Sequence, residues 1–176
     1  GVRSVIAEHA HKPEEGVYLA AAADIDAEAL RRFTAKFEHD IFCTDDYRKI
    51  LERDDIDAVF VTTPDYLHEE HTVAALEAGK AVFLEKPMAI TIEQCDRILW
   101  TAYERKCKLY IGHNMRHMSF IQKMKELVDN GAIGEVRAGW CRHFVAYGGD
   151  AYFKDWHSER ANTTGLLLQK ASHDID

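Results

Sequence analysis

The chain has 176 residues, of which 47% are hydrophobic, enough to bury one substantial core and to begin a second. Its 22 basic and 30 acidic residues give a formal net charge of -8, which argues against binding to nucleic acid or to an anionic membrane surface. No apolar run reaches the roughly 18 residues of a membrane-spanning helix, and no signal peptide is visible, so we expect a cytoplasmic protein with small-molecule partners.

The N-terminal half alternates short apolar runs with helix-patterned segments. Residues 1–12 are expected to form a loop that leads into a helix. The predicted strands cover residues 17–23, 41–43, 56–62, 81–84 and 109–112, the second of them weakly patterned. Alternation of this kind is typical of βαβ units. We therefore expect an α/β fold with a doubly wound parallel sheet.

Three crossover helices have recognisable ends. Asp26 is a candidate N-cap for a helix with the apolar stripe Leu30, Phe33 and Phe37, and Gly79 is the expected C-terminal residue of a second. The third begins with the capping-box pattern from Thr91 to Gln94.

The rhythm changes near residue 115, which is the predicted domain boundary. A helix with an apolar stripe ends at Gly131, a long strand is expected over residues 135–146, and residues 147–164 are irregular. His173 is expected near a helix start, after the apolar run of residues 166–168. Both ends of the chain are expected to be cuts.

Metal binding and disulfides are not predicted. The four cysteines lack CxxC spacing and lie in apolar-patterned segments, so we expect buried thiols in a reducing compartment. The pairs His68/His71 and His113/His117 have no third ligand at a suitable spacing.

Polar residues follow the predicted strands, and in a doubly wound sheet the carboxyl ends of the strands bind the ligand. Asp24 is placed to accept the ribose hydroxyls of NAD and to repel the 2′-phosphate of NADP, although Asp24 or Asp26 is equally explained as a helix cap. Lys86 follows another strand, between an acid and a proline. Because lysine is costly to desolvate, this position suggests a cleft, and a solvated loop lysine is the ordinary alternative. Asn114 and Arg116 either bind an anion or complete a loop.

Several of these segments together resemble the glucose–fructose oxidoreductase, inositol dehydrogenase and MocA family. The resemblance extends over nearly all of the chain. Its distinctive segments are Ala23-Asp24, residues 57–64 followed by His68, residues 75–80 leading into Glu85-Lys86-Pro87, residues 131–135, and residues 172–176.

The resemblance implies a partial NAD-binding Rossmann domain over residues 1–115, with its first strand missing, and the truncated start of a C-terminal substrate and oligomerisation domain over residues 116–176. It implies hydride transfer from a secondary alcohol of a sugar, cyclitol or related polyol; the preference for NAD over NADP rests on Asp24 alone. Lys86 would polarise the hydroxyl and His173 would exchange its proton. The complete protein would be a homo-oligomer.

The same resemblance assigns the other site residues. Those expected near the cofactor are Gly1, Arg3, Ser4, Asp24, Thr63, Pro64, His68, Glu85, Lys86 and Asn114, and those expected near the substrate are Arg116, Trp156 and Gln169. Gly1 would be the second glycine of the phosphate-binding signature, with Ser4 in place of the third. Gln169 stands where many relatives have an aspartate that pairs with the catalytic histidine.

Two alternative functions remain. One is a glycosidase that uses NAD to oxidise a sugar transiently, so that the glycosidic bond is broken by elimination. The other is a non-catalytic, nucleotide-binding regulator, to which Gln169 gives some weight because a neutral amide does not stabilise an imidazolium. The sequence does not identify the sugar or polyol.

Overall fold

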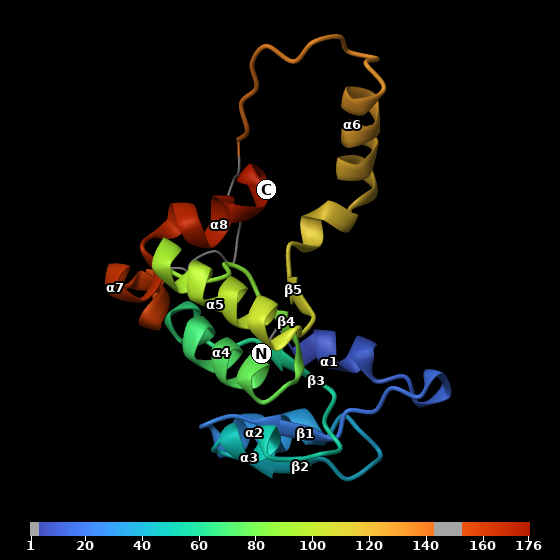
Figure 1. Cartoon of the computed structure of the whole chain (residues 1–176), viewed down its shortest axis with the longest axis vertical. Helices are drawn as coiled ribbons and strands as arrows, with labels where there is room; N and C mark the ends of the chain where they lie inside the picture. Colours follow the sequence, from blue (N-terminus) through green and yellow to red (C-terminus); the bar gives the residue numbers. More distant parts are fainter. Residues whose placement is uncertain (1–3, 143–152) are drawn as a thin grey trace.

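The computed structural model describes residues 4–142 and 153–176 (Figure 1). Strands β1 (Ala21–Ala23) and β2 (Phe42–Thr44) form one parallel sheet, and strands β3 (Ala58–Val61), β4 (Ala81–Leu84) and β5 (Leu109–Ile111) form a second, with β4 in the middle. β1 and β3 are therefore each an edge of their own sheet. The predicted α/β class with parallel strands is confirmed.

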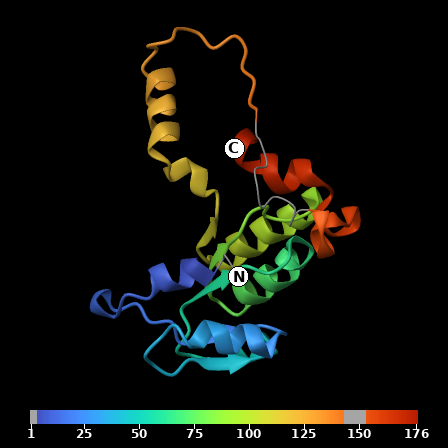
Figure 2. The ribbon, with the colours of Figure 1, turned by 180° about the vertical axis from the view of Figure 1, so that it is seen from behind.

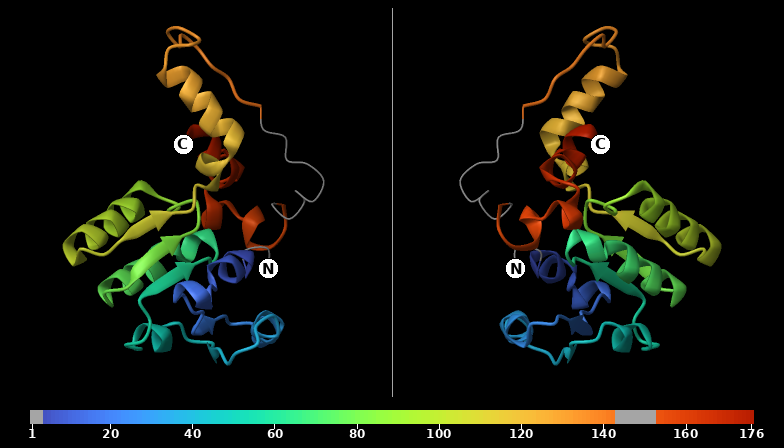
Figure 3. Two further views of the ribbon diagram at one scale, coloured as in Figure 1. Left: turned by 90° about the vertical axis from the view of Figure 1, so that its right-hand side faces the viewer. Right: turned by 90° about the vertical axis from the view of Figure 1, so that its left-hand side faces the viewer.

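Helices and 3₁₀ turns connect the strands. Their bounds are α1 (Ser4–Ala10), α2 (Ala27–Thr34), α3 (Arg48–Leu51), α4 (His68–Glu77), α5 (Ile92–Arg105), α6 (Ser119–Asp129), α7 (Arg160–Thr163) and α8 (Leu166–Ile175), with the 3₁₀ turns η1 (Pro13–Glu15), η2 (Asp65–Leu67), η3 (Asn114–His117) and η5 (Asp155–Ser158). α4 and α5 pack side by side against the three-stranded sheet, and α6 projects away from it (Figures 2 and 3).

The three predicted caps are confirmed, whereas Phe37, expected on the first helix, lies beyond the end of α2 at Thr34. The side chain of Asp26 accepts a hydrogen bond from the backbone N–H of Glu28, and Thr91 and Gln94 form the reciprocal capping box of α5. Gly79 has a φ of +76°, the left-handed conformation that ends a helix most easily at glycine. Local sequence therefore determines where these helices begin and end.

The first strand is shorter than predicted. Residues 17–20 lie outside β1. Other groups take the backbone atoms of Val17, which pairs with Lys12, and of Leu19, whose N–H and carbonyl oxygen are bonded to His11 and His39. A ladder with β2 is assigned only from Ala21 onward.

Two predictions for the C-terminal region are wrong. Residues 135–142 form no strand; their side chains are exposed and no described strand pairs with them, while residues 143–146 lie outside the described residues. The run Leu166–Leu168 is itself the first turn of α8, so His173 lies near the end of that helix and not near its start.

The core lies between α4, α5 and the three-stranded sheet. Leu76, Leu84 and Ile98 have no exposed surface, and all other members of this cluster also fall between residues 51 and 111. Complete burial of such a side chain contributes about 1.5–3 kcal/mol to folding. The edge strand β3 thus belongs to a well-packed unit, whereas β1 and β2 contribute nothing to this cluster.

All four cysteines have free thiols, but Cys43 and Cys141 are exposed and Cys95 and Cys107 are only partly buried, so the prediction of buried thiols is wrong for the first two and only partly met by the others. Within residues 4–142 and 153–176, no helix is long and apolar enough to cross a membrane.

Candidate active site

The carboxyl ends of β3, β4 and β5 meet under helix α8. The Nζ of Lys86, two residues after β4, donates a 2.6 Å hydrogen bond to the backbone carbonyl of Gln169 in α8, 83 positions later in the sequence. This bond brings the two predicted catalytic elements, the lysine after β4 and the helix that carries His173, to the same place.

His173 is partly buried, and its ring meets the ring of His113 edge-on at a centroid distance of 5.8 Å. Burial lowers the pKa of His173 to about 4, helped by the positive charge of Lys86 and by His113 and Lys170, and opposed by Asp174. The imidazole is therefore neutral near pH 7 and able to accept a proton.

Several buried polar atoms beside His173 have no hydrogen-bond partner among the described residues. They are both amide atoms of Gln169, the hydroxyl of Ser172, and the Nδ1 atoms of His113 and His173. Gln169 is only 3% exposed, and it shares one face of α8 with Ser172 and His173 because they are three and four positions apart. An unpaired buried polar group costs about 1–3 kcal/mol, so a cluster of them is typical of a place where water or a ligand binds.

The guanidinium of Arg116, a predicted substrate residue after β5, binds the carboxylate of Asp176 through two nitrogens, and its substrate role stays a prediction. This ion pair holds the pKa of Asp176 below its usual value, and His113 adds to the effect, with its Nδ1 3.8 Å from the carboxylate. The pair connects η3 to the end of α8 and so fixes one side of the site.

Asp24 lies exposed at the carboxyl end of β1. Its Oδ1 accepts a hydrogen bond from the backbone N–H of Asp26, while Asp26 itself caps α2. The helix cap is therefore Asp26, and the cofactor role of Asp24 stays a prediction. The guanidinium of nearby Arg31 is paired with Glu28.

The remaining predicted cofactor residues are distributed around the same strand ends. Thr63 and Pro64 are partly buried after β3, Glu85 is partly buried beside Lys86, and Asn114 is exposed at the start of η3. Ser4 is the first residue of α1, and Gly1 and Arg3 lie outside the described residues.

The aromatic ring of Trp156, a predicted substrate residue, packs edge-on against Tyr66 in η2 at 6.1 Å. It therefore lies beside the loop that follows β3. His68 is completely buried below this loop.

His113, Ser172 and Asp176 were not predicted as site residues. Two signals were present in the sequence: His113 comes directly after Gly112 at the end of a predicted strand, and Asp176 lies three positions after His173, where a helix places both on one side. The structure brings these residues together with Lys86 only through the return of α8 to the sheet.

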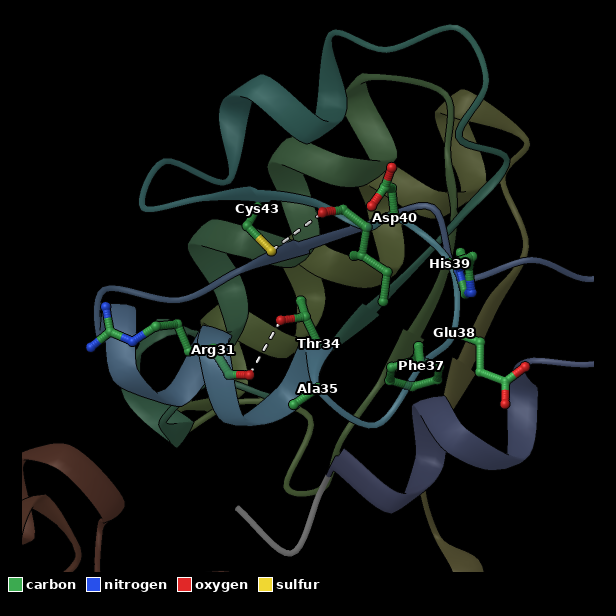
Figure 4. A pocket seen from close by; sticks show the side chains of 9 residues that line it. Arg31, Thr34, Ala35, Phe37, Glu38, His39, Asp40 and Cys43 are labelled. Atoms are coloured by element: carbon green, nitrogen blue, oxygen red, sulfur yellow. Dashed lines mark hydrogen bonds between the residues drawn. The ribbon is translucent and has the colours of Figure 1, made fainter.

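A separate hollow of about 400 Å³ lies beside the C-terminal end of α2 (Figure 4). Its lining residues include Arg31, Phe37, His39 and Cys43, and most of them belong to the segment that precedes β2. The hollow therefore lies at the amino end of β2, whereas Lys86 follows the carboxyl end of β4.

Within the residues described, no group of side chains could hold a metal ion.

Comparison with known proteins gives consistent matches. Residues 2–113 match the family model described as "Oxidoreductase family, NAD-binding Rossmann fold", and residues 121–176 match the model of the GFO/IDH/MocA C-terminal domain. The 1-carboxy-3-chloro-3,4-dihydroxycyclohexa-1,5-diene dehydrogenase of Comamonas testosteroni is 35% identical over 163 residues, which cover 91% of this chain and 40% of that protein.

Inositol 2-dehydrogenase 3 of Saccharopolyspora erythraea is 46% identical over 90 residues, covering 51% of this chain and 27% of that protein. The crystal structure of an oxidoreductase domain protein from Kribbella flavida superposes with a TM-score of 0.75 at 31% identity, covering 90% of this chain and 43% of that one. The chain thus spans less than half the length of the relatives that it matches.

Proposed function

The chain belongs to the GFO/IDH/MocA family of oxidoreductases, and on that premise we propose that it is part of an NAD-dependent dehydrogenase that oxidises a secondary alcohol of a sugar, cyclitol or related polyol. The observation that carries the proposal is that Lys86 and helix α8, which carries His173, meet at the carboxyl ends of parallel strands. Two relatives with inositol and dihydroxycyclohexadiene dehydrogenase activities in their names support the substrate class.

The residues present suit a dinucleotide. The exposed carboxylate of Asp24 follows β1, at the end of the sheet where the ribose of NAD is bound in Rossmann folds. The unpaired amide of Gln169 and the hydroxyl of Ser172 offer buried donors and acceptors next to Lys86. When bound, the nicotinamide would accept the hydride that leaves the alcohol carbon.

The protein's own groups would handle the proton and the charge. A ring nitrogen of neutral His173 accepts the hydroxyl proton as the C–H bond breaks. The ammonium group of Lys86 donates a hydrogen bond to the same oxygen and stabilises its developing negative charge, while the carbonyl of Gln169 keeps the lysine in position. The oxygen is left as a carbonyl, and the proton remains on the imidazole.

The test compares Lys86→Ala with Lys80→Ala in the complete protein. Lys80 is a matched control because it lies directly before β4, and its ammonium also donates to a backbone carbonyl, that of Arg53, at 2.7 Å. With a panel of sugars and polyols and NADH formation as the readout, we expect Lys86→Ala to lower kcat at least about 100-fold and Lys80→Ala to leave it within about twofold. Equal effects of the two changes would refute the assignment of Lys86.

Cofactor choice is tested by titrating the protein with NADH and with NADPH and following nicotinamide fluorescence. We propose tighter binding of NADH because the Asp24 carboxylate repels a 2′-phosphate. Tighter binding of NADPH would overturn this assignment of Asp24 without affecting that of Lys86.

We further propose a domain boundary near residue 115, a homo-oligomeric complete protein and a cytoplasmic location. The boundary is supported by the two family models, the first of which ends at residue 113 and the second of which begins at residue 121. Light scattering of the complete protein measures the oligomeric state.

A further inference from the structure

His68 is a completely buried histidine that connects two loops of the site. It is the first residue of α4, and it has no exposed surface. Its Nδ1 lies 2.7 Å from the carbonyl oxygen of Pro87, and its Nε2 lies 2.9 Å from the carbonyl oxygen of Thr63. One ring therefore contacts both the loop after β4, directly beside Lys86, and the loop after β3.

The chemistry of these contacts determines the protonation state. A backbone carbonyl oxygen only accepts hydrogen bonds, and a neutral imidazole has a single N–H to donate. Both contacts are hydrogen bonds only when both nitrogens carry a proton, that is, when the ring is an imidazolium. A neutral ring would place a nitrogen lone pair against one of the two carbonyl oxygens, at a distance where this contact is repulsive.

We propose that His68 is a positively charged positioning residue, which holds the loops after β3 and β4 together and thereby fixes Lys86 for catalysis. It acts through Lys86 and does not touch the substrate. The part that concerns catalysis rests on the proposed dehydrogenase function, whereas the part that concerns charge and bridging does not.

The surroundings of His68 agree with a positive charge. Among the described residues, Asp65 is the only carboxylate that is buried, at 3% exposure, and it lies one turn before His68. Carboxylates are rarely buried without compensating charge or hydrogen bonds. The other titratable or charged groups on the segments around His68 include Tyr66 in η2, Glu70, His71 and Glu77 in α4, Glu85 and Lys86 after β4, the ion pair between Glu69 and Arg97, and Arg160 in α7, which packs against η2.

The direct test is nitrogen NMR of the ¹⁵N-histidine-labelled protein at pH 7, which distinguishes an imidazolium from either neutral tautomer. His71 is an internal control, because burial lowers its pKa and its Nδ1 contacts the hydroxyl of Thr63 and not a carbonyl. We expect two protonated ring nitrogens for His68 and a neutral ring for His71. A neutral tautomer at His68 would overturn the proposal, and this result requires neither a variant nor enzymatic activity.

The role in catalysis is tested with His68→Gln and the matched change His71→Gln on the same helix. We expect His68→Gln to lower kcat at least about tenfold while changing the Kd of NADH by less than about threefold, because a misplaced lysine weakens the transition state more than cofactor binding. In a Lys86→Ala background, the same change should lower kcat by less than about twofold. His71→Gln should stay within about twofold of the parent protein.

If His68→Gln lowers kcat as strongly in the Lys86→Ala background as in the parent protein, His68 does not act through Lys86, and the positioning role is refuted. If the protein oxidises no alcohol, the proposed function fails, and the NMR result still decides whether His68 bridges the two loops as a cation. The two failures are therefore distinguishable.

Discussion

Replacing Gln169 with aspartate should raise the pKa of His173. The two residues are four positions apart on α8, a spacing at which side chains on a helix lie about 6 Å apart. Two unit charges at about 6 Å interact with about 3 kcal/mol at an effective dielectric constant of about 20. Burial of the new carboxylate offsets part of this attraction, since position 169 is 3% exposed. One pKa unit corresponds to about 1.4 kcal/mol, so we expect the pKa of His173 to rise from about 4 to about 5–6.

Two assays measure this change. An NMR titration follows the ring of His173 directly, and the acid limb of kcat/KM for alcohol oxidation should move to higher pH by the same amount, because only the neutral imidazole accepts the proton. The same substitution at Gln122, which is exposed on α6, is the matched control and should move neither. An unchanged pKa of His173 in Gln169→Asp would refute the electrostatic argument.

The lowered pKa of His173 also has a consequence for stability. The unfolded chain takes up a proton at this histidine below about pH 6.5, whereas the folded chain resists doing so until about pH 4. The free energy of unfolding therefore falls as the pH drops through this window, and it falls less in Gln169→Asp.

Two further changes test the packing and the helix ends. Ile98→Ala should lower the free energy of unfolding by about 2–5 kcal/mol, because Ile98 is completely buried between α5 and the sheet. Urea unfolding followed by circular dichroism measures this loss. The control is Trp100→Ala at an exposed position of the same helix, which should change the free energy of unfolding by less than about 0.5 kcal/mol. Thr91→Ala should cost about 1 kcal/mol in the same assay by removing the capping box of α5, and a cost near zero would contradict that role.

The sequence predicted most accurately the features that depend on neighbouring residues. The cap at Asp26, the capping box at Thr91 and the glycine end of α4 at Gly79 each involve only a few consecutive positions. The strand of residues 81–84 was predicted with its observed bounds, and its carboxyl end correctly located Lys86.

Features that depend on distant segments were not predictable in this way. The hydrogen bond from Lys86 to Gln169 joins residues 83 positions apart, and the contact of His113 with His173 also joins segments that are distant in the sequence. The strand expected over residues 135–146 had the right residue pattern, but a strand also requires a partner, and none is described beside residues 135–142. The β propensity of a segment is therefore a weak predictor of a strand when the partner strand is unknown.

The division of the strands into two sheets has a consequence for how the chain loses its structure. Among the described residues no ladder hydrogen bonds join β1 and β2 to the other three strands, and the buried cluster lies between α4, α5 and the sheet of β3, β4 and β5. For this 176-residue chain alone we therefore expect two levels of cooperativity: backbone amides of β1 and β2 should exchange with solvent deuterium through a local opening, and those of β4 only when the whole packed unit unfolds. A single melting temperature would then describe the second level and not the first.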